Sequence, residues 1–142
     1  MTGLRYIPAI HRITHQVGLS IASAKTLGVS QGEAHILAHL AGAGDSTIAE
    51  LHTAFAHKRS TLTSILDRLA DRKLVTREVS ESDRRSFLIA LTRTGGKLAT
   101  RVLSHLAAIE ERVDLILTPR EQEQLAMLLA RIETTMLATL AQ

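Results

Sequence analysis

The apolar positions at the start of the chain recur at helical spacing and predict two helices. The first extends over residues 4–27 and ends at Gly28. The second begins after Ser30, whose spacing to Glu33 is that of a capping box, in which two side chains satisfy each other's backbone N–H groups. It stops at the AGAG segment, residues 41–44.

Two further helices follow, separated by a turn over residues 56–58. Thr47 and Glu50 repeat the capping-box spacing in front of a short apolar helix. The next helix covers residues 59–73, and its apolar residues form an i, i+3, i+4, i+7 stripe: Leu62, Ile65, Leu66 and Leu69. The opposite face of this helix is polar and carries short side chains near its start.

The pattern then changes to a period of two, which predicts a β-hairpin of residues 75–79 and 87–91 around a charged tip. A long fifth helix follows Thr92. A sixth begins after Thr118, which has the capping-box spacing to Glu121 and is followed by proline, and it runs nearly to the end of the chain. The predicted fold is therefore mainly α with a small β-hairpin wing. Three helices followed by such a hairpin are typical of a winged helix-turn-helix.

Composition agrees with a helical protein of 142 residues. Hydrophobic residues make up 45% of the chain but aromatic residues only 2%, so its core must be built from aliphatic side chains. The net charge of +3 favours an anionic partner. Because the chain has no cysteine, no signal-peptide pattern and no long apolar run, we expect a soluble cytoplasmic protein without a membrane interaction.

The polar face of the fourth helix and the hairpin tip together suggest binding to double-stranded DNA. The major groove admits one α-helix whose outward side chains are short enough to approach base edges. The minor groove, with its concentrated negative potential, attracts the guanidinium group of arginine. The residues expected to contact DNA are Ser60, Thr61, Thr63 and Ser64 on the helix face, Lys58, Arg59, Arg68 and Arg77 at phosphates, and Asp83, Arg84 and Arg85 at the tip. Arg85 is expected to enter the minor groove with Arg84 assisting, while Asp83 orients one of them.

The stretch LDRLADRKLVTREVSESDRRSFLIALTRTGGKLA resembles the wing region of the multiple-antibiotic-resistance-regulator (MarR) family of bacterial transcription factors. The most specific part is D-x-R, Asp83 and Arg85, followed by a strand and by L-T-x-x-G, Leu91, Thr92 and Gly95. The order of all six helices agrees too, so the resemblance covers nearly the whole chain.

The resemblance implies a homodimer that binds a palindromic operator, usually as a repressor that a small ligand releases from DNA. It divides the single domain, residues 1–142, into a winged-helix lobe at 30–92 and a dimerisation lobe formed by 1–29 and 93–142. The surplus apolar positions of the last helix support an interface independently. The ligand is expected in a cleft bordered by the first, second and fifth helices, where His11, His15, His35 and His105 are the candidate residues.

Three positions depart from what is common in the family. Lys73 replaces a glycine after the fourth helix, and a left-handed turn there would cost roughly 1 kcal/mol. Lys58 replaces a serine cap, which loses about 1 kcal/mol of capping but adds charge near DNA. Ser64 occupies a place where some relatives present an arginine that reads a base. Recognition of DNA shape is therefore expected to contribute more to specificity here, and direct base contacts less.

Two alternatives remain for the function. His11 and His15 are one helical turn apart, as are His35 and His39, and such a pair could chelate zinc, which would make the protein a metal-responsive regulator of the same fold. The winged helix could instead bind protein without binding DNA. Enzyme activity is not expected, because Ser104 and His105 are neighbours that point in different directions on one helix, and no phosphate-binding glycine loop or cofactor motif occurs.

Overall fold

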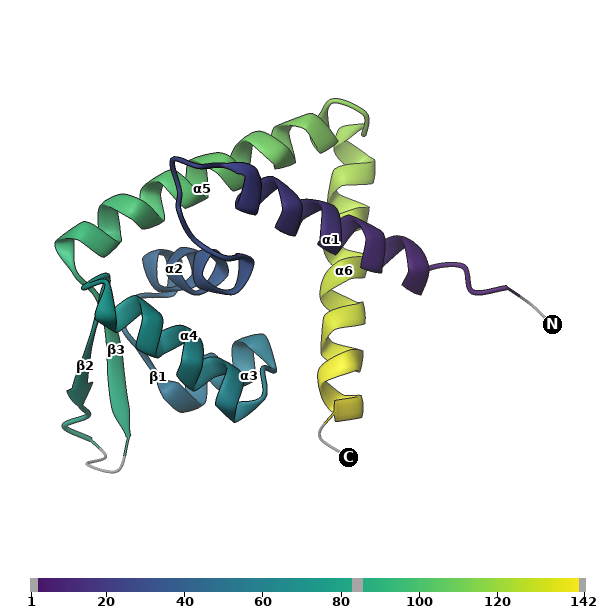
Figure 1. Cartoon of the computed structure of the whole chain (residues 1–142). Helices are drawn as coiled ribbons and strands as arrows, with labels where there is room; N and C mark the ends of the chain where they lie inside the picture. Colours follow the sequence, from purple (N-terminus) through teal and green to yellow (C-terminus); the bar gives the residue numbers. More distant parts are fainter. Residues whose placement is uncertain (1–2, 83–85, 141–142) are drawn as a thin grey trace. The chain divides into compact units, whose positions relative to one another are not determined.

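A computed structural model describes residues 3–82 and 86–140 of the chain. The chain forms two compact units, Met1–Leu103 and Ser104–Gln142, which we describe separately. The helices and strands, labelled in Figure 1, are α1 Ile7–Ser23, α2 Gln31–Ala43, β1 Ser46–Thr47, α3 Ile48–Phe55, α4 Arg59–Asp71, β2 Val75–Val79, β3 Phe87–Leu91, α5 Arg93–Asp114 and α6 Pro119–Leu140. All six predicted helices and the hairpin are confirmed, although α1 is shorter at both ends than residues 4–27.

The wing belongs to a three-stranded antiparallel sheet with the order β1-β3-β2. Strands β2 and β3 pair from Val75 with Leu91 to Val79 with Phe87, the hairpin expected from the sequence. The prediction of a two-stranded hairpin was incomplete, because β1 also pairs with β3 through Ser46 and Ile89. A strand of two residues is too short to show a period of two in the sequence.

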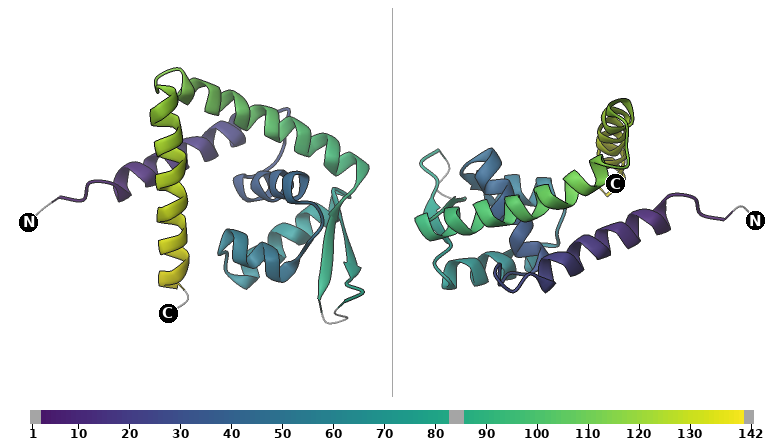
Figure 2. Two further views of the ribbon diagram at one scale, coloured as in Figure 1. Left: turned by 180° about the vertical axis from the view of Figure 1, so that it is seen from behind. Right: turned by 90° about the horizontal axis from the view of Figure 1, so that it is seen from above.

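The core of the first unit surrounds α2, which has α3 and α4 on one side and the first half of α5 on the other (Figures 1 and 2). A Cβ atom on Gly32 of α2 would lie 2.8 Å from Cδ1 of Ile65 on α4, so these two helices approach closely. The predicted stripe of α4 is confirmed, since all four of its members are buried: Leu62, Ile65, Leu66 and Leu69. Burial of this stripe turns the polar face of α4 outward.

The turn after α4 is joined to the start of α5 through backbone groups. Lys73 has a φ of 58°, so the left-handed turn is present here although the residue is a lysine. The hydroxyl of Thr92 donates to the carbonyl oxygen of Lys73 at 2.7 Å and accepts from the N–H of Gly95 at 3.0 Å. A Cβ atom on Gly95 would lie only 1.8 Å from the carbonyl oxygen of Leu74. The threonine and glycine of L-T-x-x-G therefore connect the end of α4, the base of the wing and α5.

The second unit contains the end of α5 and the whole of α6. Thr118 and Glu121 form the predicted capping box, with the N–H of Thr118 donating to Oε2 of Glu121 at 2.8 Å and the N–H of Glu121 donating to Oγ1 of Thr118 at 3.3 Å. No described residue of α6 is buried, and its exposed apolar side chains include Leu125, Met127, Leu128, Leu129, Ile132, Met136 and Leu140. Within residues 3–82 and 86–140, no helix has the length and apolarity needed to cross a membrane.

Replacing Gly95 with alanine is expected to destabilise the protein by about 3 kcal/mol, because the new methyl group would overlap a backbone carbonyl that cannot rotate away. Gly96→Ala is the matched control, since no atom lies within 4 Å of the position a Cβ would take there. It should stabilise the helix by about 0.5–1 kcal/mol. Urea denaturation of both variants measures the difference, and equal stabilities would contradict the close approach at Gly95.

Lys73→Gly is expected to increase the free energy of unfolding by roughly 1 kcal/mol, because glycine adopts the left-handed conformation without steric cost. Lys25→Gly, at an exposed position outside a helix, is the control for the added flexibility of an unfolded chain that contains one more glycine. Thermal or urea unfolding checks both variants. If Lys73→Gly loses as much stability as the control, the left-handed conformation has no steric cost for lysine at this position.

Candidate nucleic-acid interface

Two exposed cations lie at the N-terminus of α4. Lys58 is the N-cap residue and its side chain makes no capping hydrogen bond, as expected from the sequence. Arg59 is the first helical residue and is also exposed. The free N–H groups and the positive end of the helix dipole add to these two charges. This end of α4 is therefore suited to an anionic group such as a phosphate.

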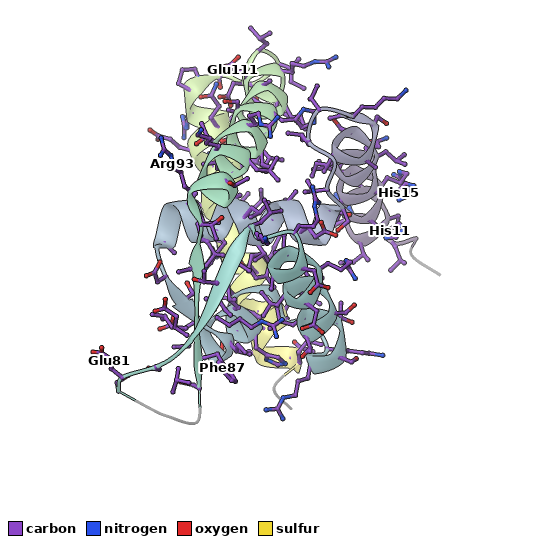
Figure 3. The ribbon with its side chains drawn as sticks, turned by 60° about the vertical axis from the view of Figure 1, so that its left-hand side comes forward. His11, His15, Glu81, Phe87, Arg93 and Glu111 are labelled. Carbon is purple, nitrogen blue, oxygen red and sulfur yellow. The ribbon has the colours of Figure 1, made fainter. Side chains whose placement is uncertain are left out.

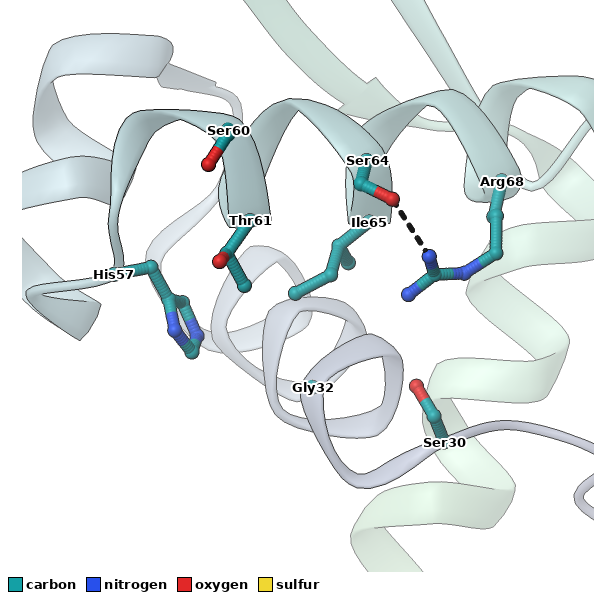
Figure 4. Close-up of a pocket in the computed structure, with 8 residues that line it drawn as sticks. All are labelled: Ser30, Gly32, His57, Ser60, Thr61, Ser64, Ile65 and Arg68. Carbon is teal, nitrogen blue, oxygen red and sulfur yellow. Dashed lines mark hydrogen bonds between the residues drawn. The ribbon is translucent and has the colours of Figure 1, made fainter.

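Hydroxyl groups cover the outward face of α4 behind these cations. Ser60, Thr61 and Ser64 line an open groove of about 480 Å³, together with Ser30, Gly32, His57, Ile65 and Arg68 (Figure 4). Thr63 is exposed, and its hydroxyl donates to the carbonyl oxygen of Arg59 at 2.9 Å, which leaves its oxygen free to accept. All four predicted hydroxyl residues are accessible on the helix surface.

One flank of α4 is attached to α2 through the buried carboxylate of Glu33. Nε of Arg68 donates to Oε1 of Glu33 at 3.0 Å, and Nη1 of Arg72 lies 3.4 Å from Oε2. Arg72 also donates to the carbonyl oxygen of Gly28 at 2.8 Å. The Glu33 side chain is 8% exposed, so its buried charge depends on these ion pairs for compensation. Arg68, predicted to contact phosphate, is thus engaged within the protein.

The other flank of α4 is attached to the wing by an ion pair. Nη2 of Arg77 on β2 donates to Oδ1 of Asp67 at 2.5 Å. Asp67 belongs to the same exposed face of α4 as Ser60 and Ser64, at spacings of three or more residues along the helix. The hydroxyl face of α4 and the exposed side of β2 therefore adjoin each other. Arg77, also predicted to contact phosphate, has an intramolecular partner too.

The far end of the wing carries an exposed apolar pair. Val79 is 54% exposed and Phe87 is 45% exposed, and they pair across β2 and β3. Figure 3 shows Phe87 and Glu81 near the end of the hairpin. The predicted minor-groove residues Asp83, Arg84 and Arg85 lie outside the described residues.

The histidines proposed for a ligand cleft occupy different environments. His11 and His15 project from α1 and are exposed, with parallel rings whose centroids are 6.5 Å apart (Figure 3). His35 on α2 is half-buried, and this burial lowers its pKa below the usual 6.5. His105 lies in the second unit and is partly exposed. In the part of the chain that the structure describes, no group of three or more His, Cys, Asp or Glu side chains could hold a metal ion.

Sequence reasoning missed the ion pairs that attach α4 to α2 and to the wing. Ser30 and Glu33 predicted a capping box, but only half of it forms: the Glu33 N–H donates to the Ser30 hydroxyl at 3.2 Å. The carboxylate of Glu33 instead binds arginines 35 and 39 residues away. No local pattern reveals such a pairing, because both arginines also fit a solvated helix flank.

Comparison with known proteins identifies the family. The HTH-type transcriptional repressor MdtR of Bacillus subtilis (strain 168) is 30% identical over 112 residues, which are 79% of this chain and 72% of MdtR. The chain belongs to the MarR family. A profile of this family also matches residues 27–86, which contain α2, α3, α4 and most of the wing.

Two solved structures of the same fold have lower sequence identity. The S. aureus MepR–DNA complex has a TM-score of 0.82 at 22% identity, and covers 94% of this chain and 99% of the MepR chain. Bordetella bronchiseptica BpsR, whose DNA binding is regulated by 6-hydroxynicotinic acid, has a TM-score of 0.74 at 20% identity. It covers 92% of this chain and 97% of the BpsR chain. The winged helix-turn-helix with helical terminal segments is thus the fold of this family member.

The lowered pKa of His35 predicts a loss of stability at acidic pH. A histidine whose pKa is lower in the folded state favours its neutral form there, so its contribution is present above the unfolded pKa near 6.5 and is lost as the pH falls below that value. His35→Gln should flatten the dependence of the unfolding midpoint on pH between 7 and 5. His11→Gln, which replaces an exposed histidine, is the matched control. Identical slopes for wild type and His35→Gln would contradict the burial effect.

Proposed function

We propose that this protein is a sequence-specific regulator of transcription that binds double-stranded DNA as a homodimer and represses by occupying a palindromic operator. The observation that carries the proposal is the Asp67–Arg77 ion pair, which joins the hydroxyl face of α4 to the wing. One duplex can then meet α4 in its major groove and the wing beside it. Membership of a family that includes the repressor MdtR supports the same function.

The residues of α4 divide into two kinds of DNA contact. Lys58 and Arg59 bind phosphates at the end of the helix, where both side chains are exposed and without a capping role. The hydroxyl groups approach base edges, to which serine and threonine can donate or accept a hydrogen bond. These hydroxyl residues are Ser60, Thr61, Thr63 and Ser64.

Arg68 and Arg77 are less suited to the phosphate role, because each must leave a carboxylate partner to take it. The wing tip supplies the minor-groove contact, with Arg85 inserted, Arg84 assisting and Asp83 orienting one of the two. Val79 and Phe87, exposed beside this tip, offer an apolar surface for the sugars that line the groove.

Dimerisation uses the terminal helices, in the division expected from the sequence: residues 30–92 bind DNA, and residues 1–29 and 93–142 form the dimer. The exposed apolar side chains of α6 support this division, since an apolar helix face of that length is covered in a stable protein. A two-fold dimer places two copies of α4 on a two-fold DNA site.

A small ligand releases the repressor from its operator. The regulation of BpsR by 6-hydroxynicotinic acid makes aromatic acids the first class to try. The candidate ligand residues are those expected from the sequence, His11, His15 and His35 in the first unit and His105 in the second. Zinc is the alternative effector, for which α1 offers the two parallel imidazoles of His11 and His15.

Binding to operator DNA tests the wing assignment. The operator is first selected from fragments of the source genome, and selection is repeated with aromatic acids and with zinc. Arg85→Ala should then weaken operator binding by about 1–3 kcal/mol in a fluorescence-anisotropy titration, because one minor-groove contact is lost, while the dimer remains intact in sedimentation.

Arg120→Ala is the matched control, because Arg120 is exposed at the start of α6 in the second unit. It should leave the affinity unchanged. Equal affinities of wild type and Arg85→Ala would refute the wing contact. Failure of the wild type to enrich any duplex would favour a winged-helix module that binds protein instead.

A further inference from the structure

The carboxylate of Glu33 is placed to act on the DNA-facing side of α4 through Arg68. Glu33 is the third residue of α2 and would ordinarily return to cap its own helix. Its two oxygens instead each contact a different arginine of the α4 flank, at 3.0 Å and 3.4 Å. The interaction fixes the guanidinium group of Arg68, whose side chain is 49% exposed.

Arg68 in turn determines how Ser64 presents its hydroxyl group. Nη1 of Arg68 donates to Oγ of Ser64 at 2.8 Å, one helical turn away (Figure 4). Because an arginine has no acceptor, the hydroxyl of Ser64 must be the acceptor in this contact. Its own hydrogen therefore points elsewhere, and the nearby positive charge makes that hydrogen a better donor.

We propose that Glu33 is a positioning residue for base selection, which acts through Arg68 to hold the Ser64 hydroxyl as a hydrogen-bond donor toward the operator. This inference rests on the proposed function, since it needs α4 in the major groove. A donor at that place prefers the acceptors N7 and O6 of guanine, N7 of adenine and O4 of thymine over the amino group of cytosine.

Glu33 has a second effect, on binding that does not depend on sequence. While its carboxylate pairs with Arg68, part of the guanidinium charge is offset and its Nε–H is already occupied. An arginine released from this pair would add one sequence-independent phosphate contact. Glu33 thus lowers the affinity for any DNA and raises the discrimination between sequences.

The variant that tests this inference is Glu33→Gln, which keeps the size of the side chain and removes its charge. Affinity for a random duplex should rise about threefold to tenfold, and the slope of log affinity against log salt should become steeper by about 1, because one further phosphate is neutralised. Discrimination at one base pair of each half-site should fall about fivefold, the loss expected for one hydrogen bond. Titrations at several salt concentrations, against the operator and its single-base variants, measure all three quantities.

Three further variants separate the steps. Ser64→Ala should lose the same base preference without any change in salt slope, because it removes the hydroxyl and leaves the ion pair. Arg68→Lys should also lose the preference, since a lysine lacks the fork that contacts Glu33 and Ser64 together. This variant retains the positive charge at position 68. It can replace Glu33→Gln as the test of base preference if Glu33→Gln folds poorly. Glu50→Gln is the matched control, because Glu50 is the third residue of α3 and its carboxylate accepts from the N–H of Thr47 in the capping box of its own helix.

The outcomes distinguish this inference from the proposed function. Wild-type protein that binds no duplex overturns the proposed function itself. If the wild type binds DNA, but Glu33→Gln and Arg68→Lys have the same salt slope and base preferences as the wild type, the role of Glu33 is overturned. The proposed function is then unaffected. A uniform loss of affinity for all sequences in Glu33→Gln, with the wild-type slope, would show that Glu33 only stabilises the fold.

Discussion

Burial of a single apolar stripe on α4 determines the orientation of the helix on which the DNA interface depends. Leu62, Ile65, Leu66 and Leu69 are all buried, and Ile65 packs closely against α2 at Gly32. The hydroxyl residues on the opposite side are consequently exposed as a set. Any rotation large enough to hide them would expose leucine and isoleucine side chains to water, at roughly 1.5–3 kcal/mol for each.

Ion pairs on both flanks complete the positioning of α4. Glu33 attaches one flank to α2, and Asp67 attaches the other to β2. An exposed ion pair contributes little to stability, so the main effect of the Asp67–Arg77 pair is to orient α4 against β2. The buried Glu33 carboxylate is different, because removal of its partners would leave an uncompensated charge in the protein interior. Arginines that resemble free phosphate ligands are therefore part of the scaffold that holds the hydroxyl face.

Local conformational preference is overridden at both ends of the same helix. Lys58 occupies a cap position without capping, and Lys73 adopts a left-handed conformation that favours glycine. Tertiary contacts maintain the end at Lys73, since Thr92 bonds the carbonyl oxygen of Lys73, and Gly95 lets α5 approach Leu74. Conflicts between local preference and structure are expected to concentrate at functional sites. Here they place lysines at the two ends of the helix that we assign to the major groove.

The sequence by itself determined the six helices, the hairpin and the buried stripe of α4, because each depends on a periodicity or a cap within a few residues. The capping box of Thr118 and Glu121 formed as its spacing indicated. The box of Ser30 and Glu33 formed only in half, because Arg68 and Arg72 compete for the carboxylate. Strand β1, the engagement of Arg68 and the contact of Asp67 with Arg77 were decided only by the tertiary structure. Such pairings join residues that are distant in sequence or lie on different elements, and their charges look the same in the sequence whether they face a partner or water.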